Sequence, residues 1–308
     1  MRGWWWKVTG AVLLGYGAMI GGAKFMEREL VFRAAHAKAR LTEPQGAYAP
    51  PHTRVEFAAA DSTKLVGWVI PAAPADSNGV WVLYCHGNAH NLSQYDEPEF
   101  YAYLRALGVN ILTFDYRGFG ESNGAPDEQG SYADAHAAYD LLRTTYHVSP
   151  SRIVIYGHSM GTGVAVQLAS TVPAGALILQ APYTSIPDLG ADRFWYLPVR
   201  AMATYRFPSI DRIASIKVPL LVLASPQDAV ISVAMGERLH LAAGSIDKRL
   251  IHVMGGHELA FRVDSGIFFR AFREMVATVA KAPGHVSDVP GPDTLTTSAT
   301  SAKSGTRG

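Results

Sequence analysis

A serine between two glycines is the first feature of this sequence that could do chemistry. Residues 157–161 read Gly-His-Ser-Met-Gly, with Ser159 at the centre of a G-x-S-x-G pattern. An apolar run rich in Ile and Val precedes the pattern, and residues 162–171 after it have helical character. A strand, a sharp turn with a central serine and a helix are together typical of a nucleophile elbow. The pattern therefore predicts that Ser159 is a nucleophile and that the N–H of Met160, at the helix start, binds an oxyanion.

A second copy of the pattern surrounds Ser122, at residues 120–124. It follows a turn-like sequence and continues into Ala-Pro-Asp, so Pro126 and its neighbours favour a loop after the serine. Because a nucleophile elbow needs a helix at this point, we predict Ser159 as the nucleophile and reject Ser122.

A serine hydroxyl also needs a base, and the base needs an acid to orient it. In a parallel sheet such groups lie in the loops after the strands. Asp228 follows the apolar run at residues 220–224, and His257 follows the run at residues 249–253. Two glycines directly before His257 would let its loop bend toward Ser159. We therefore predict His257 as the base and Asp228 as the acid.

Each of these two assignments has a rival. His252 is a second histidine near this point, but it lies inside the predicted strand. Glu258 could orient His257 in place of Asp228, although adjacent side chains seldom face each other well. Asp228 could also be a turn residue or a helix cap, and His257 an ordinary loop histidine.

The loop after the run at residues 80–85 is expected to supply a second oxyanion donor. It begins His-Gly-Asn, and Gly87 permits a tight turn that leaves the N–H of Asn88 able to point at the site with that of Met160. We expect His86 to be a structural residue that packs under this loop.

The elements around these residues alternate between short apolar runs and stretches of helical periodicity. The predicted strands are residues 53–57, 64–70, 80–85, 110–115, 153–156, 176–180, 220–224 and 249–253, and the predicted helices are residues 97–107, 131–146, 162–171, 232–243 and 264–281. Ser131 is the expected cap of the second helix. The alternation predicts an α/β fold, with a mostly parallel eight-stranded sheet, helices on both faces and a hairpin at one edge.

Residues 4–23 form an apolar stretch that begins with three tryptophans and has basic residues at both ends. Its length approaches the ~20 residues that a helix needs to span a bilayer, and tryptophan is common at membrane interfaces. We therefore predict a membrane anchor over residues 1–24, with no preferred orientation because both ends are basic. A cleaved signal peptide and a buried N-terminal helix are the alternatives.

The remainder of the chain divides into three predicted parts. Residues 25–50 are charged and then rich in proline, and form a connector. Residues 51–281 form the catalytic domain, with a small cap at residues 181–216. Residues 282–308 have almost no apolar bulk, which predicts a disordered tail.

The composition gives no sign of a nucleic-acid partner, an internal disulfide or a cofactor. The net charge of +1 gives no sign of a nucleic-acid partner, and the single cysteine excludes a disulfide within the chain. The sequence has no Cys-x-x-Cys and no paired-histidine metal spacing, so we expect neither a metal nor an organic cofactor. Seven other histidines are expected to be surface or hydrogen-bonded structural residues: His36, His52, His90, His136, His147, His240 and His285.

Six motifs in this order resemble those of the α/β-hydrolase-fold serine hydrolases. They are His86-Gly-Asn, Asp115-Tyr-Arg-Gly-Phe-Gly, Gly157-His-Ser-Met-Gly, Ala181-Pro-Tyr-Thr-Ser, Asp228 and Gly256-His. The sequence is most similar to the membrane-anchored Bem46-like and ABHD12/13/17-like branch, which also has an N-terminal anchor followed by a segment like residues 25–33. The resemblance implies the fold and the catalytic class but no substrate. Two departures are the absence of glycine before Asp228 and the Glu-Leu pair after His257.

The predicted cap is rich in aromatic and basic side chains. Its aromatic residues are Phe194, Trp195, Tyr196, Tyr205 and Phe207, and its arginines include Arg193, Arg200, Arg206 and Arg212. The aromatic residues could accept an acyl chain beside Ser159, or could simply pack the cap onto the core. The arginines could attract an anionic head group, but a solvated surface is the simpler interpretation.

These observations predict a serine hydrolase that cleaves ester or thioester bonds of an apolar, lipid-like acyl substrate. A serine peptidase or amidase shares the acyl-enzyme chemistry and is one alternative. A membrane-tethered binding module without activity is the alternative from a different class.

Overall fold

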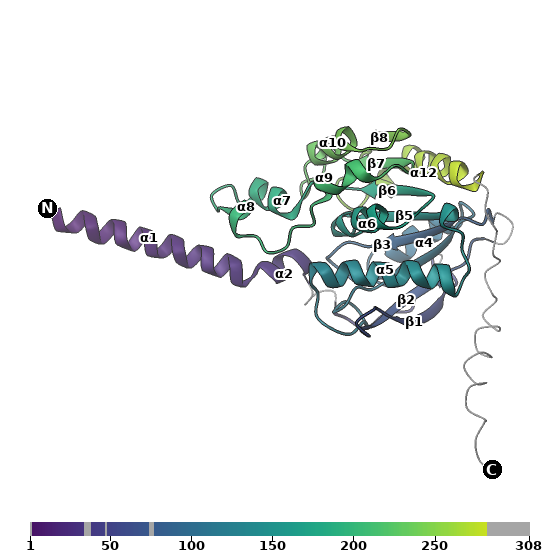
Figure 1. The fold of residues 1–308 in the computed structure, drawn as a ribbon, viewed down its shortest axis with the longest axis horizontal. Helices are drawn as coiled ribbons and strands as arrows, with labels where there is room; N and C mark the ends of the chain where they lie inside the picture. Colours follow the sequence, from purple (N-terminus) through teal and green to yellow (C-terminus); the bar gives the residue numbers. More distant parts are fainter. Residues whose placement is uncertain (1, 34–37, 47, 74–76, 282–308) are drawn as a thin grey trace, which may run out of the picture.

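The computed structural model describes residues 2–33, 38–46, 48–73 and 77–281 (Figure 1). Its centre is one sheet of eight strands, in the order β1-β2-β4-β3-β5-β6-β7-β8. The strands are β1 (Thr53–Ala58), β2 (Lys64–Ile70), β3 (Trp81–Cys85), β4 (Asn110–Phe114), β5 (Ile153–His158), β6 (Ala176–Gln180), β7 (Leu220–Ala224) and β8 (Lys248–His252). The β1–β2 and β2–β4 pairs are antiparallel, and the other pairs are parallel. The predicted sheet and its edge hairpin are therefore confirmed.

Helices cover both faces of this sheet. The helices around the sheet are α4 (Glu97–Arg105), α5 (Glu128–Thr144), α6 (Met160–Thr171), α10 (Val233–Ala242), α11 (Ala260–Val263) and α12 (Ser265–Ala280). Side chains of β5 alternate between two hydrophobic cores, as the two-residue period of a strand requires. Ile155 packs in the core with α5, α6 and α10, and Tyr156 packs in the core with α4 and α12.

The second core helix begins earlier than the sequence predicts. α5 begins at Glu128, and its cap is Asp127, whose side chain accepts a hydrogen bond from the N–H of Gly130 (2.9 Å). The prediction that Ser131 caps the helix is therefore wrong. Gly130 lies inside the first turn, and the side chain of Arg117 packs where a side chain at this position would stand.

The N-terminal region consists of two helices in series, α1 (Arg2–Phe25) and α2 (Glu27–Phe32). The stretch Trp6–Phe25 is long and apolar enough to cross a membrane, a property that signal sequences share, and none of its most apolar window is buried against the rest of the chain. The alternative of a buried N-terminal helix is therefore wrong. The first part of the predicted connector forms α2, in which Phe32 is fully buried and packs edge-on against Tyr205.

The segment between β6 and β7 corresponds to the predicted cap. It contains α7 (Ile186–Arg193), α8 (Val199–Met202), α9 (Ser209–Arg212) and the short 3-10 helix η2 (Ile213–Ser215). A further 3-10 turn, η1 (Pro150–Arg152), precedes β5. Figure 1 shows α7 and α8 beside α1 and α2, at one end of the sheet. The predicted tail, residues 282–308, lies outside the described residues.

Candidate active site

The G-x-S-x-G sequence forms a tight turn between β5 and α6, with Ser159 at its apex. Ser159 has φ 53° and ψ −121°, a conformation that is strained for a residue with a side chain. Its N–H donates to the carbonyl of Gln180 (3.0 Å), and its carbonyl accepts from the Thr162 hydroxyl (2.7 Å). These bonds on both sides hold the strained turn and raise the serine side chain above the sheet edge.

The two glycines of the pattern are required by close packing. A Cβ on Gly157 would lie 2.6 Å from the carbonyl oxygen of Gly161, and a Cβ on Gly161 would lie 2.0 Å from that of Cys85. Both distances are shorter than any normal contact, so the backbone of α6 can approach β3 and β5 only where these side chains are missing.

The structure brings the three distant residues predicted for catalysis into one line of hydrogen bonds. The Ser159 hydroxyl lies 2.8 Å from Nε2 of His257, to which it can donate. Nδ1 of His257 lies 2.7 Å from Oδ2 of Asp228, which accepts from it. This geometry places a proton acceptor beside the serine and a carboxylate beside that acceptor, as acyl-transfer chemistry requires.

Asp228 is held by hydrogen bonds within its own loop, although no glycine stands in the four residues before it. Its Oδ1 accepts from the N–H groups of Val230 and Ile231, each at 2.8 Å. Burial alone would raise the pKa of this carboxyl, but the hydrogen bond and charge of His257 and the two backbone N–H groups hold the pKa below its ordinary value. The carboxylate is therefore ionised and oriented when it faces the imidazole.

The histidine loop owes its shape to the glycines before it and to a residue that the sequence analysis did not single out. Gly255 and Gly256 have φ values of +114° and +69°, in the region that favours glycine. Oε1 of Gln227 accepts from the N–H of Gly255 (3.0 Å), so the loop that holds Asp228 and the loop that holds His257 are joined directly. His158 adds a second link, because its Nε2 donates to the carbonyl of His257 (3.2 Å).

The rivals of the predicted residues have other partners. His252 contacts Glu237 on an exposed part of the molecule (3.1 Å). Glu258 reaches only Nε2 of His257, at 3.9 Å, and not the nitrogen that faces Asp228. Ser122 is fully buried, and its hydroxyl donates to the carbonyl of Asp115 (2.7 Å) while it accepts from a backbone N–H of β2.

The two predicted oxyanion donors border the same turn. Met160 is the first residue of α6, where a backbone N–H has no partner within the helix. The loop that holds Asn88 passes close to the serine, because a Cβ on Gly87 would lie 3.4 Å from that of Ser159. The Asn88 side chain donates to the carbonyl of Val31, and the ring of His86 is buried below the loop.

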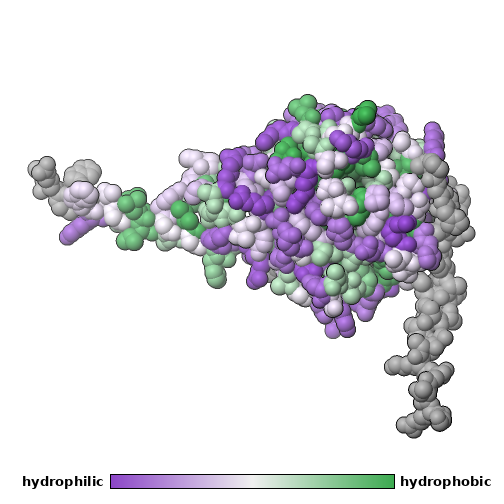
Figure 2. Space-filling model, viewed as in Figure 1, coloured by the Kyte–Doolittle hydropathy of each residue, from purple (hydrophilic) through white to green (hydrophobic). Residues whose placement is uncertain are grey.

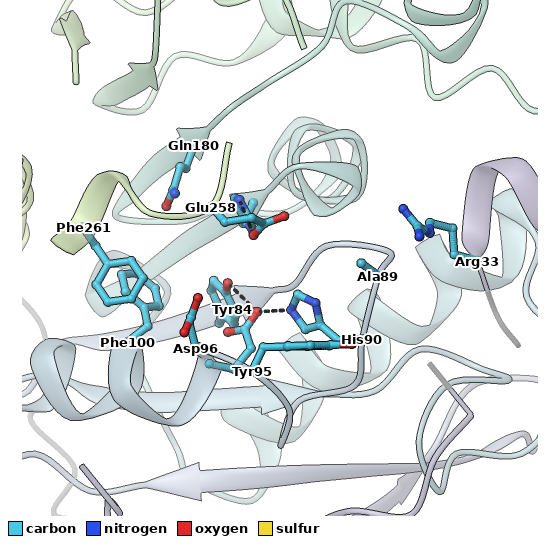
Figure 3. A pocket seen from close by; sticks show the side chains of 12 residues that line it. Arg33, Tyr84, Ala89, His90, Tyr95, Asp96, Phe100, Gln180, Glu258 and Phe261 are labelled. Atoms are coloured by element: carbon cyan, nitrogen blue, oxygen red, sulfur yellow. Dashed lines mark hydrogen bonds and ion pairs between the residues drawn. The ribbon is translucent and has the colours of Figure 1, made fainter. Parts of the chain in front are cut away.

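A pocket of about 260 Å³ opens beside this turn (Figure 3). Phe100 and Phe261 stand at one end, with ring centres 5.3 Å apart, and Arg33 stands at the other. Glu258, which follows His257 in the sequence, also lines the pocket. The pocket thus combines an apolar end with a polar one, next to the candidate nucleophile.

A buried charged pair in this pocket escaped the sequence analysis. Nε2 of His90 donates to Oε1 of Glu97 (2.9 Å), and the Tyr84 hydroxyl donates to the same oxygen (3.1 Å). Burial opposes both charges, but their mutual attraction raises the pKa of His90 and lowers the pKa of Glu97. His90 was expected only to be a surface or structural residue, and its spacing from Glu97 gave no signal of a shared pocket.

The five aromatic residues of the cap do not line this pocket. Phe207 is fully buried in the core against Tyr132, and Phe194 and Tyr196 face α1 and α2 instead of Ser159. The interpretation that they cover the nucleophile is therefore wrong, because the cap leans toward the N-terminal helices. Aromatic side chains near the nucleophile come from α4 and α11 instead.

One cluster among the described residues has ligand atoms close enough together for a metal ion. His158, His257 and Glu258 each offer one ligand atom within 4.8 Å of the others. Both ring nitrogens of His257 already face Ser159 and Asp228. The cluster is better suited to proton transfer than to metal binding.

The family model described as the alpha/beta hydrolase fold matches residues 80–211 of this chain. An uncharacterized protein of Mycobacterium tuberculosis is 39% identical over 221 residues, which cover 71% of this chain and 77% of that protein. The sheet, the elbow and these matches together show that the chain belongs to the α/β-hydrolase family.

Two further relatives have names that refer to activity or to the fold. The lysophosphatidylserine lipase ABHD12 of Danio rerio is 32% identical over 199 residues, which cover 58% of this chain and 50% of the lipase. The human alpha/beta hydrolase domain-containing protein 17C is 39% identical over 164 residues, which cover 53% and 48%. The chain thus spans about half the length of each.

Solved structures resemble the fold at low sequence identity. The esterase Pf2001 of Pyrococcus furiosus aligns with a TM-score of 0.63 and 21% identity, covering 78% of this chain and 98% of the esterase. An α/β hydrolase of Vibrio vulnificus aligns with a TM-score of 0.64 and 20% identity, covering 83% and 93%. At these identities the likeness concerns the fold alone.

Proposed function

We propose that this protein is a serine hydrolase that cleaves carboxylic ester or thioester bonds through an acyl-enzyme intermediate. The observation that carries the proposal is the hydrogen-bonded line from Ser159 through His257 to Asp228, at 2.8 and 2.7 Å. The line begins at a strained elbow, where the serine has few other partners for its hydroxyl. The proposed substrate is an ester of an apolar acyl group.

The proposed reaction has two halves. The Ser159 oxygen attacks the carbonyl carbon while His257 takes the hydroxyl proton at Nε2, and the N–H groups of Met160 and Asn88 stabilise the oxyanion. His257 then returns that proton to the leaving alcohol or thiol as the acyl-enzyme forms. In the second half a water molecule gives a proton to His257 and attacks the acyl carbon, and the Ser159 oxygen leaves with that proton.

Asp228 has a positioning role in this scheme. Its carboxylate, ionised because its pKa is lowered, fixes the proton of His257 on Nδ1 and leaves Nε2 free to accept. The apolar end of the neighbouring pocket, at Phe100 and Phe261, offers a surface for an acyl chain. The lipase name of the ABHD12 relative supports a lipid-like ester as the substrate class.

Hydrolysis of p-nitrophenyl esters of increasing acyl length tests the proposal. We expect turnover by the wild-type protein and none above background by Ser159→Ala. Ser122→Ala, which changes the serine of the other G-x-S-x-G pattern, is the matched control and should keep its activity. Faster cleavage of aminoacyl anilides would indicate a peptidase or amidase, and inactivity of the folded protein on both substrate types would favour a binding module.

We also propose that α1 anchors the protein to a membrane as a single span. The length and apolar composition of α1, and its exposure along the candidate span, support this assignment. Residues 25–50 then connect the anchor to the hydrolase domain, residues 51–281. Alkaline carbonate extraction of membranes tests the anchor, because an integral protein stays in the pellet and release into the supernatant would contradict it.

A further inference from the structure

The tip of the cap has an unusual surface for a water-soluble domain. Residues 194–203 read Phe-Trp-Tyr-Leu-Pro-Val-Arg-Ala-Met-Ala, with one charged side chain in ten positions. Trp195 is 82% exposed and Tyr196 is 46% exposed. A contiguous apolar surface of this kind marks a contact with another apolar phase.

Hydrogen bonds fix this cap tip, residues 194–203, along α1. The Tyr16 hydroxyl donates to the carbonyl of Tyr196 (2.9 Å), and the ammonium of Lys24 donates to the carbonyl of Met202. At the base of the tip, the Glu27 carboxylate accepts from the backbone N–H of Tyr205 (3.1 Å). The position of the tip relative to a membrane therefore follows from the position of α1.

An apolar groove of about 380 Å³ separates the tip from the N-terminal helices. Its walls include Met19, Ala23, Leu30, Phe194, Leu197 and Met202. Figure 2 shows hydrophobic residues along α1 and hydrophilic residues where the helix meets the body of the domain. The groove is thus continuous with the apolar surface of the candidate span.

The backbone of the tip is largely satisfied by its own hydrogen bonds. The N–H groups of Phe194, Leu197 and Val199 donate to carbonyls within residues 190–197 (2.8 Å each). Those of the three residues after Arg200 donate to carbonyls of residues 198 and 199. A segment without this internal pairing would be costly in lipid, because hydrocarbon offers no hydrogen-bond partners.

The length of α1 gives the depth of the tip. Its 24 residues extend about 36 Å at 1.5 Å per residue, close to the roughly 40–45 Å of a bilayer with its headgroups. With Phe25 at one headgroup surface, Trp4 and Trp6 lie toward the opposite interface. Tyr16 then lies about 14 Å below the surface on the domain side, so the tip beside it reaches below the headgroups of one leaflet.

From these observations we propose that the cap tip, residues 194–203, inserts into one leaflet of the bilayer beside α1, and that lipid acyl chains fill the groove between them. The inference rests on the proposed anchoring by α1 and does not depend on the proposed hydrolysis. The argument for lipid over a protein partner is the bond between Tyr16 and the tip, which holds the tip at the level of the candidate span.

Fluorescence quenching of single-cysteine variants tests the insertion. The full-length protein is placed in vesicles of phosphatidylcholine and phosphatidylglycerol, and an environment-sensitive label is attached at Trp195→Cys. Val12→Cys, on the exposed surface of α1, reports on the anchor, and Ile246→Cys, a fully exposed apolar position before β8, is the matched control. The natural Cys85 is buried, and the unsubstituted protein gives its background labelling.

The insertion predicts that labels at 195 and 12 are quenched by nitroxides attached to the lipids, whereas the label at 246 is quenched only by aqueous iodide. If the label at 195 behaves like that at 246 while the label at 12 is quenched by lipid, the insertion is refuted and the anchor stands. If neither 195 nor 12 is quenched by lipid, both are refuted. Shielding of 195 from iodide without quenching by lipid would indicate a protein contact, such as a second copy, and would also overturn the proposal.

Discussion

The two G-x-S-x-G turns of this chain share one sequence pattern and differ in what surrounds their serines. Ser159 has a positive φ, stands at a strand–helix junction and has a hydroxyl 2.8 Å from an imidazole nitrogen. Ser122 is fully buried in a loop, and its hydroxyl is hydrogen-bonded on both sides to backbone groups. The comparison teaches that the pattern supplies a turn, whereas the element after it decides whether the serine is presented to a base or used to hold the loop.

Replacement of each serine by alanine should give the largest difference between the two turns. Ser159→Ala should lower kcat for ester hydrolysis by about 10⁶-fold, because it removes the attacking atom. The measurement is turnover of p-nitrophenyl esters by protein whose fold is checked by circular dichroism. Equal losses from Ser159→Ala and Ser122→Ala at unchanged fold would contradict the assignment.

Asp228→Asn should have the next largest effect on activity. The amide cannot fix the His257 proton on Nδ1, so Nε2 no longer reliably accepts from Ser159, and kcat should fall by about 10⁴-fold. Glu258→Gln is the matched control, since Glu258 does not reach the nitrogen that faces Asp228. A larger loss from Glu258→Gln would assign the orienting role to Glu258.

Substitution of the last glycine in each G-x-S-x-G pattern should lower the stability of the protein by different amounts. Gly161→Ala places a Cβ against the Cys85 carbonyl and should lower the free energy of unfolding by about 3 kcal/mol. The counterpart, Gly124→Ala, meets only ordinary contacts at φ +85°, so the expected cost is about 1–2 kcal/mol, from the backbone conformation. Urea denaturation measures both, and the reverse order would contradict the close packing at the elbow.

Ser122→Ala should reveal the structural use of the second turn. It leaves the buried N–H of Val66 without its acceptor, so the free energy of unfolding should fall by about 1–3 kcal/mol. Ser93→Ala, at another buried serine, provides a comparison for the loss of any buried hydroxyl. A stable Ser122→Ala protein with altered ester turnover would point to a role for this serine in catalysis.

The smallest expected effect is a change with pH in the amount by which the Asp228 carboxylate stabilises the folded protein. The pKa of Asp228 is lowered in the folded protein, so its carboxylate stabilises the fold above the unfolded pKa of about 3.9. This contribution is lost as the pH falls through the lower, folded pKa. The difference in Tm between the wild type and Asp228→Asn should therefore shrink in acid, and a difference independent of pH would contradict the lowered pKa of Asp228.

The sequence predicted Ser159, Asp228 and His257 because their positions follow from the topology of the sheet. Continuous apolar runs mark buried parallel strands, and the loops after such strands meet at one edge of the sheet. This rule was enough to bring Asp228 and His257 to Ser159, although they are far apart in the sequence. The elbow could also be predicted from the sequence, because its tight turn requires glycine at positions 157 and 161.

The features that the sequence did not predict depend on the placement of one element against another. The His90–Glu97 pair forms because α4 packs under the loop after β3, and no spacing rule signals that contact. Phe194 and Tyr196 of the cap face α1, whose position relative to the domain is set by hydrogen bonds to Tyr196 and Met202. α5 begins one turn before Ser131, and Asp127 caps it through the N–H of Gly130, beside which the side chain of the distant Arg117 packs.

Mapping the residue that a fluorophosphonate probe modifies is the most direct test of the comparison between the two turns. The probe forms a stable bond with an activated serine, and mass spectrometry of the digested protein identifies that serine. The structure predicts a single modified peptide that contains Ser159, with labelling abolished by His257→Ala. Modification of Ser122, or no modification of the folded protein, would contradict the account.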